Sequence, residues 1–219
     1  MAVREKFDYD LQTLRDQLLQ LGSLAEIALT QSFEALKTKN SDLALQVLEN
    51  DTKIDLLDEE INDFAILLIA KQQPVAIDLR RIIVAIKIAT DVERMADFAV
   101  NIAKSAIRIG EQPFVISLNK LEKMHEIAVN MLSLTLKAYY EEDVVTAKKV
   151  ADMDDEVDRL YGETIRELLE RTKAHPDAMS QITQLSFTAR YIERIADHAT
   201  NIAENVFYLV KGRHYDLND

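Results

Sequence analysis

Two nearly identical phrases in the chain carry acids at a spacing suited to metal chemistry. Residues 93–103 read ERMADFAVNIA, and residues 193–203 read ERIADHATNIA. Each phrase holds a Glu and an Asp four residues apart, Glu93 with Asp97 and Glu193 with Asp197. Residues at this spacing lie on one face of a helix. Carboxylates that share a face supply the oxygen ligands that hard cations prefer.

A second set of acids has the same spacing, Asp51 with Asp55 and Asp154 with Asp158. Turns are expected at Pro74 and Pro176, between each of these pairs and one of the phrases. Helices rise by about 1.5 Å per residue, so an antiparallel hairpin brings each acid of the second set level with one of the first. The sequence therefore predicts two groups of four carboxylates, each facing a groove between two helices.

Like charges brought this close either stay splayed in water, take up protons or hold a cation. One acid pair alone is typical of a solvated helix edge. The repetition of the arrangement in both halves favours a cation. Asn101 and Asn201 extend the same stripe by one turn, where each either supplies an amide oxygen or is simply solvated. The spacing sets the level of these side chains along the axis but not their rotation toward the groove.

Other chemistry has less support in the sequence. A metal-dependent hydrolase could use the acid groups, but no obvious base, nucleophile or glycine-rich phosphate loop accompanies them. Glu122 and His125 form a single Glu-x-x-His pair, whereas a ferritin-like metal-storage helical bundle needs two matched pairs. His198 is within reach of a metal rim, but a role at a helix edge or between helices is favoured. Arg94 and Arg194 are expected to form ion pairs or partner contacts rather than to bind metal. We therefore predict no catalytic residues.

Long amphipathic helices must position these acids, because apolar residues recur three and four apart in almost every window. Breaks at Gly, Pro and Asn-Ser signals divide the chain. The predicted helices cover residues 8–39, 41–72, 75–109, 114–140, 143–174 and 177–211. Gly 4 and Pro 3 are low counts for 219 residues, which also indicates an all-α fold.

The helix pattern repeats along the chain, with apolar residues recurring together with the acids. Asp51, Ile54, Asp55 and Leu57 recur as Asp154, Val157, Asp158 and Leu160. The economical interpretation is two tandem, pseudo-symmetric three-helix bundles, residues 1–110 and 111–219, joined at Gly110 to Pro113. Antiparallel helices with short turns would pack these units into one elongated body.

Composition limits the partners and the compartment. The formal net charge of −12 repels phosphate backbones and argues against nucleic acid. The chain has no cysteine, which excludes thiolate metal sites and is compatible with the cytoplasm. We find neither a signal peptide nor a transmembrane segment, because charge interrupts every longer apolar run.

Several phrases together resemble the PhoU family of accessory and regulatory proteins of bacterial phosphate-specific transport. They are KFDYDLQTL near the start, QQPVAIDLRRI at residues 72–82, the paired acidic phrases, and FYLVKG at residues 207–212. The resemblance covers essentially the whole chain. It implies two three-helix bundles whose acid-xxx-acid motifs bind metal ions, iron or zinc, while magnesium, manganese and calcium stay open. Residues 175–178 read HPDA where the first half has QPVA, so the two turns need not make the same contact.

The resemblance also implies partners. It implies a negative regulator of the phosphate-starvation response that links the ATPase subunit of the phosphate ABC transporter to a membrane sensor histidine kinase. It implies a cytoplasmic protein, peripheral to the inner face of the plasma membrane, and is compatible with a homodimer. We further hypothesise that the acid grooves and the flanking basic residues Arg80, Arg81, Arg94 and Arg194 form a docking surface whose geometry depends on the metal.

Overall fold

The structure is a computed structural model that describes residues 3–215. Its helices are α1 (Val3–Thr38), α2 (Ser41–Gln72), α3 (Ala76–Ile109), α4 (Asn119–Glu141), α5 (Val144–Ala174) and α6 (Met179–Lys211). A short 3-10 helix, η1 (Pro176–Ala178), precedes α6. The described residues contain no strand, which confirms the all-α prediction.

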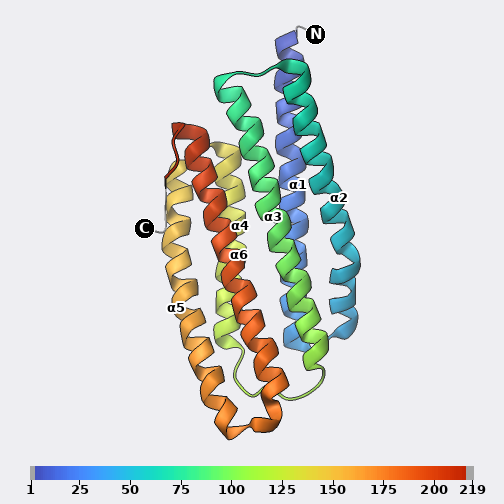
Figure 1. The fold of residues 1–219 in the computed structure, drawn as a ribbon, viewed down its shortest axis with the longest axis vertical. Helices are drawn as coiled ribbons and strands as arrows, with labels where there is room; N and C mark the ends of the chain where they lie inside the picture. Colours follow the sequence, from blue (N-terminus) through green and yellow to red (C-terminus); the bar gives the residue numbers. More distant parts are fainter. Residues whose placement is uncertain (1–2, 216–219) are drawn as a thin grey trace.

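The six helices form two antiparallel three-helix units that lie side by side (Figure 1). Helices α1 to α3 make the first unit, and α4 to α6 make the second. Helix α3 packs along α6, and α1 packs along α4, so the two units are joined lengthwise. The units are displaced along the common axis, so that the turn between α2 and α3 projects at one end and the turn between α5 and α6 at the other.

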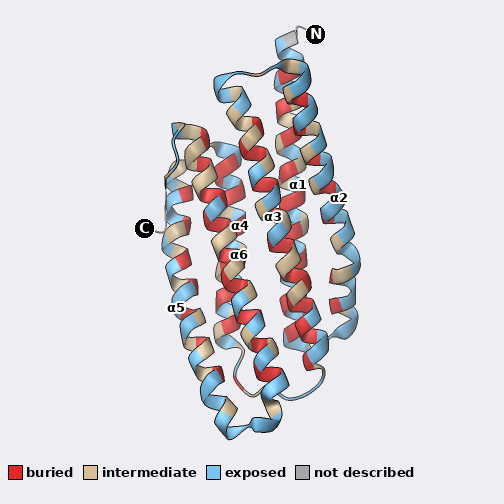
Figure 2. Cartoon of the chain, in the orientation of Figure 1, coloured by how far each residue is buried: buried red, intermediate tan, exposed pale blue. Residues whose placement is uncertain are grey.

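One continuous apolar core runs through both units, and Figure 2 shows the buried residues along the facing sides of the helices. Alanines are frequent on the central helices, and those at Ala85, Ala89, Ala99, Ala196 and Ala203 are fully buried. Small side chains let α3 and α6 approach closely, and larger residues such as Ile88 and Ile192 fill the space beside them. The outer faces carry charged residues, some of which pair between neighbouring helices.

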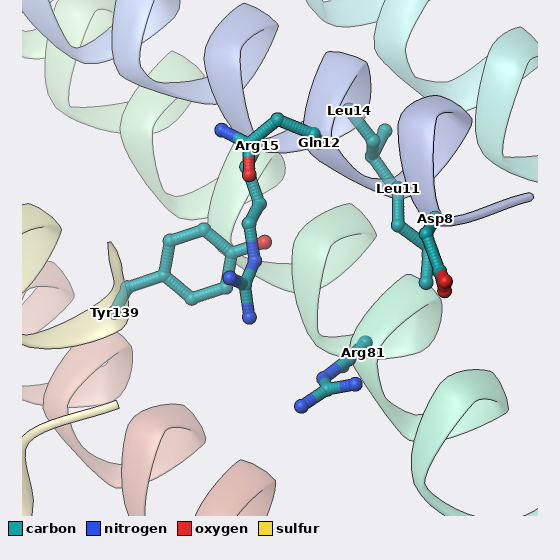
Figure 3. Close-up of a pocket in the computed structure, with 7 residues that line it drawn as sticks. All are labelled: Asp8, Leu11, Gln12, Leu14, Arg15, Arg81 and Tyr139. Carbon is teal, nitrogen blue, oxygen red and sulfur yellow. The ribbon is translucent and has the colours of Figure 1, made fainter. Parts of the chain in front are cut away.

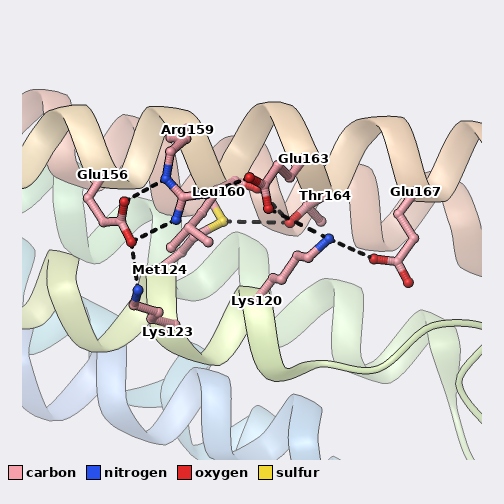
Figure 4. A network of polar contacts seen from close by, with 9 residues as sticks. All are labelled: Lys120, Lys123, Met124, Glu156, Arg159, Leu160, Glu163, Thr164 and Glu167. Carbon is pink, nitrogen blue, oxygen red and sulfur yellow. Dashed lines mark hydrogen bonds and ion pairs between the residues drawn. The ribbon is translucent and has the colours of Figure 1, made fainter.

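Such pairing is dense between α4 and α5 (Figure 4). Lys123 lies 2.6 Å from Glu156, and Lys120 lies 3.1 Å from Glu167. Arg159, on the same helix as Glu156, also pairs with it. Arg159 and Lys123 together lower the pKa of Glu156 to about 2. Exposed ion pairs add little stability individually, so this network chiefly fixes the register of α5 on α4.

Two predicted helix boundaries differ from the structure by more than two residues. Helix α1 begins at Val3 rather than at residue 8, and α4 begins at Asn119 rather than at residue 114. Residues 110–118 form a connector instead, because Gly110 has a φ of 64° and Pro113 lacks an N–H. The Gln181 side chain donates to the Pro113 carbonyl and accepts from the Val115 N–H, which holds this connector in place.

No helix within the described range 3–215 is both long and apolar enough to cross a membrane. Each helix has a polar outer face, as expected from the amphipathic pattern.

Candidate functional site

The structure places each predicted group of acids on two helices of one unit that pack against each other. The first acid group consists of Asp51 and Asp55 on α2 with Glu93 and Asp97 on α3. The second acid group consists of Asp154 and Asp158 on α5 with Glu193 and Asp197 on α6. In each unit the two helices are consecutive and antiparallel (Figure 1), and the residue count places the acids of one helix level with those of the other.

In the first acid group, the carboxylates repel one another across the groove. Burial, and then repulsion from Asp55 and Asp97, raises the pKa of Asp51 above its ordinary value. Burial and repulsion from Asp97 likewise raise the pKa of Glu93, with smaller effects from Asp55 and Asp58 on α2. The predicted register between α2 and α3 is therefore correct. Asp51 and Glu93 are half-buried, whereas Asp55 is exposed.

The second acid group lies deeper in the protein. Only 5% of Asp154 and 9% of Glu193 is exposed to solvent. Burial, followed by repulsion from Asp158 and Asp197, raises the pKa of Asp154 to about 7. Burial and repulsion from Asp197 raise the pKa of Glu193 to about 7, against an opposing effect of Arg190. Asp154 and Glu193 are therefore mostly buried, whereas a single acid pair is typical of a solvated helix edge.

Three carboxylate oxygens in the second acid group or beside the first are buried without a hydrogen-bond partner. They are Oδ1 of Asp154, Oε2 of Glu193 and, beside the first acid group, Oδ1 of Asp58. A buried ionised oxygen without a partner is costly. Such a group gains stability by taking up a proton or by binding a cation. Oxygen donors alone suit hard metal ions, so the donor set fits a metal.

Arginines from the same helices neutralise part of this charge. Arg94 Nη1 lies 2.9 Å from Asp97 Oδ2, and Arg194 Nη1 lies 3.5 Å from Asp197 Oδ2. Arg190 pairs with Glu193. The prediction that Arg94 and Arg194 form ion pairs is confirmed. As placed, no three acidic or histidine side chains among the described residues stand close enough to hold one ion, so metal binding requires the carboxylates to turn toward each other.

Other residues singled out from the sequence lie elsewhere. Asn101 is half-buried on α3, and Asn201 lines a groove between α3 and α6 that also contains Lys87 and Asp91. No contact joins either amide to an acid group within residues 3–215, and their role as ligands stays a prediction. His198 bonds to Asp91 of α3 at 2.9 Å, which confirms the interhelical role expected for it.

Two basic residues are not where the docking hypothesis needs them. Arg80 donates to the carbonyl of Leu209 at 3.3 Å, and Arg81 Nη2 lies 3.1 Å from Glu142. Both arginines therefore reach the ends of helices in the second unit, because α3 starts beside the point where α4 and α6 finish. They do not flank an acid group, and that part of the hypothesis is wrong.

Two charged residues beside the acid groups, Asp58 and Arg190, were not singled out from the sequence. Asp58 follows Asp55 on the same side of α2, and burial raises its pKa; its spacing of three from Asp55 was the available signal. Arg190 lies one turn before Glu193 and had the same signal. The repeat relates Asp58 to Tyr161, over whose ring Arg190 lies at 5.9 Å. The two groups are thus equivalent in position but different in surroundings.

Comparisons with known proteins agree with this architecture. The family model described as "PhoU domain" matches residues 18–106 and 121–206. A phosphate-specific transport system accessory protein PhoU homolog from Clostridium acetobutylicum is 38% identical, over 99% of this chain and 99% of the relative. A homolog of the same description from Zymomonas mobilis is 41% identical, over 94% of this chain and 87% of the relative.

Two solved structures have the same fold. The crystal structure of PhoU from Pseudomonas aeruginosa has a TM-score of 0.90 at 35% identity, and covers 94% of this chain and 100% of its own. The crystal structure of the phosphate transport system regulatory protein PhoU from Streptococcus pneumoniae has a TM-score of 0.90 at 27% identity, with coverage of 96% and 99%. Sequence and structure together lead to one conclusion: the chain belongs to the PhoU family.

Proposed function

We propose that this protein is a metal-binding regulatory adaptor of phosphate uptake. It acts on the cytoplasmic side of the membrane and restrains the phosphate-starvation response. Its partners are the ATPase subunit of the phosphate ABC transporter and a membrane sensor histidine kinase. The proposal is supported by the family to which the chain belongs and by the names of its relatives, which describe accessory and regulatory proteins of phosphate transport.

The second acid group is the observation that carries the metal-binding part of the proposal. Asp154 and Glu193 are buried, and each has a carboxylate oxygen without a hydrogen-bond partner. A divalent cation would satisfy both oxygens and remove the repulsion from Asp158 and Asp197. These four side chains would hold the ion. The first acid group would hold a second ion more weakly, because its members are less buried and need less compensation.

A bound ion would couple metal content to the shape of the unit. Asp154 and Asp158 lie on α5, whereas Glu193 and Asp197 lie on α6. Drawing these carboxylates onto one ion would fix the two helices relative to each other near the middle of the hairpin. The exposed faces of α5 and α6 would then present one geometry to a partner, which is how metal content would influence docking.

The test is elemental analysis of the full chain purified without added metal, together with binding to the isolated transporter ATPase subunit. The test variant combines Asp154→Asn with Glu193→Gln. A matched control combines Asp152→Asn with Glu170→Gln, which removes two exposed acids of α5 outside the acid group. We expect the test variant to lose bound metal and to bind the ATPase at least tenfold more weakly, with the control unchanged in both.

Equal metal content and equal ATPase binding in all three proteins would overturn the proposal. Loss of metal with unchanged ATPase binding would retain the site and reject its role in docking. Iron that turns over with oxygen would instead support a metal-storage helical bundle, the alternative function considered from the sequence.

A further inference from the structure

A small cavity whose lining includes two arginines lies outside both acid groups. It has a volume of about 150 Å³ and lies between α1, the start of α3 and the end of α4. Figure 3 shows Arg15 beside the ring of Tyr139, with Arg81 across the opening. Leu11 and Leu14 form the apolar part of the wall. The cavity therefore combines two arginines and a phenol with the carboxylate of Asp8, and Arg81 Nη1 also lies 3.4 Å from Asp78 Oδ1.

The two arginines converge on a single oxygen atom. Glu142 Oε1 lies 2.6 Å from Arg15 Nη2, 3.1 Å from Arg81 Nη2 and 3.3 Å from Arg81 Nε. Three N–H donors directed at one oxygen form a ready-made oxyanion site. Glu142 is the C-cap of α4, and its φ is 54°. Its side chain is 30% exposed to solvent. Because the side chain is partly exposed, a rotation toward water would leave these donors to another oxyanion.

Tyr139 adds a donor that lacks an acceptor. The residue is 1% exposed, and burial raises its pKa to about 12, so the phenol keeps its proton. Its polar partner is Arg15, which can only donate hydrogen bonds. Within the part of the chain that the structure describes, no residue accepts the phenol's proton. The residue lines the cavity, where an acceptor oxygen of a ligand would take the hydrogen bond that water otherwise accepts.

The equivalent end of the other unit is closed by the chain itself. The repeat relates Arg81 to Gln181, which bonds to Pro113 and Val115 of the connector. It relates Glu142 to Lys39, which donates to the carbonyl of Glu111 at 3.2 Å. The connector therefore packs between Lys39 and Gln181, whereas the equivalent positions Glu142 and Arg81 lie beside an open cavity.

We propose that this cavity binds a small tetrahedral oxyanion, with inorganic phosphate as the first candidate, between the guanidinium groups of Arg15 and Arg81 and the hydroxyl of Tyr139. The volume equals that of roughly five liquid waters, which admits such an ion with a few waters and excludes a nucleotide. Asp8 also lines the cavity, but its carboxylate lies 3.0 Å from Arg4 Nε. This inference goes beyond the proposed function and does not depend on metal at the acid groups.

In this arrangement Glu142 is an internal competitor of the ligand. Ligand and carboxylate use the same N–H donors, so removing the negative charge of Glu142 strengthens binding, and removing a donor weakens it. Release of Glu142 would also free the turn between α4 and α5. The site would thereby report the anion through a change at the surface of the second unit.

The test is calorimetric titration of the full chain with inorganic phosphate, after treatment with a chelator so that the acid groups carry no metal. We expect one phosphate per chain, with about tenfold tighter binding in Glu142→Gln. Arg81→Gln should weaken binding at least tenfold, and Tyr139→Phe about fivefold. Arg159→Gln removes an equal charge and an ion-paired arginine elsewhere, and Tyr140→Phe changes an exposed neighbouring phenol. Neither control should alter the affinity.

A second titration with sulfate and acetate identifies the ligand chemistry. Sulfate that binds as tightly as phosphate supports a general tetrahedral oxyanion site, and a preference for phosphate assigns the site to it. Acetate that binds more tightly than both would overturn the proposal. So would the absence of saturable phosphate binding in both the wild type and Glu142→Gln, or equal weakening by Arg81→Gln and Arg159→Gln. None of these outcomes affects the metal and docking tests of the proposed function.

Discussion

Nδ1 of His198 lies 2.9 Å from Oδ1 of Asp91, and this contact joins α6 of the second unit to α3 of the first. The repeat relates the same two positions to Phe98 and Tyr191, whose ring centroids are 5.9 Å apart. The two pairs lie side by side near the middle of α3 and α6, where the ring centroids of Phe98 and His198 are 5.8 Å apart, and one pair is polar while the other is aromatic. The pseudo-symmetry preserves the positions of the contacts while their chemistry has diverged.

This relationship predicts strong coupling between Asp91 and His198. Both side chains are only 15% exposed, so changing one of them leaves the other without its partner. We expect Asp91→Tyr and His198→Phe each to lower the free energy of unfolding by about 1–2 kcal/mol. The double variant recreates the aromatic pair and should recover most of that loss. Urea unfolding of the four proteins measures the coupling, and strictly additive effects would contradict the prediction.

A second pair of equivalent contacts lies between α1 and α4. A Cβ added at Gly22 would stand 2.2 Å from Cδ1 of Leu136, a buried side chain. The repeat relates these positions to His125 and Phe33, whose rings stack with centroids 4.6 Å apart. The position equivalent to Gly22 is therefore occupied by a large side chain, His125, which stacks on Phe33. Gly22 leaves room for Leu136.

We expect Gly22→Ala to destabilise the protein by about 1 kcal/mol. Overpacking of a buried contact costs about 1–3 kcal/mol, which outweighs the gain of up to about 1 kcal/mol from replacing Gly in a helix. In a Leu136→Ala background the sign should reverse. Gly162 of α5 has no atom within 4 Å of the added Cβ, so Gly162→Ala is the matched control and should stabilise. Thermal unfolding compares them, and stabilisation by Gly22→Ala in the wild-type background would refute the argument.

His125 predicts a loss of stability on acidification. Burial lowers its pKa to about 4, although Glu122 and the bond to the Leu29 carbonyl act in the opposite direction. Further carboxylates line the groove beside it, Glu26, Glu34 and Glu126. The unfolded chain binds a proton near pH 6.5 and the folded chain near pH 4, so this residue lowers stability as the pH falls through that window.

The expected loss due to His125 is about 2 kcal/mol between pH 7 and pH 5. His125→Gln keeps a donor for the Leu29 carbonyl and removes the titration, so its stability should fall less over the same range. His175→Gln alters an exposed histidine at the end of α5 and should behave as the wild type. Urea unfolding at the two pH values provides the measurement. An identical pH dependence for His125→Gln and the wild type would show that burial of this imidazole does not contribute.

Much of this architecture follows from local patterns in the sequence. Apolar spacing predicts the helices, and counting from Pro74 and Pro176 places Asp51 and Asp154 opposite their partners. These features are predictable because a helix has a fixed rise and a hairpin fixes the level of its two arms. The same fixed geometry explains why one repeated phrase forms two equivalent groups of acids.

Features that depend on packing between the units were not predictable. The burial of Glu193 depends on how α6 is rotated against α5, and spacing along one helix does not set that rotation. Arg81 reaches Glu142 because the units are displaced lengthwise, which no local pattern encodes. Apolar spacing predicts a helix from residue 114, but the connector at residues 110–118 is held by Gln181, which lies far along the chain.

The second acid group makes a prediction with the opposite sign to that of His125. Asp154 has a pKa of about 7 in the folded protein and an ordinary value near 4 in the unfolded chain. The folded state therefore binds more protons between these values, and the metal-free protein loses stability as the pH rises from 4 through 7. Water at the edge of the group screens part of this effect, so we expect a loss of about 1 kcal/mol.

Asp154→Asn should remove that loss and should be more stable than the wild type at pH 8 in the presence of a chelator. Asp152→Asn changes an exposed acid of the same helix and should leave the pH dependence as it is. Adding a divalent cation at pH 8 should stabilise the wild type and the Asp152 control, because the ion replaces the missing proton, and should have little effect on Asp154→Asn. Thermal unfolding with and without the cation gives both readouts. Equal stabilisation of all three proteins would place the ion outside the second acid group.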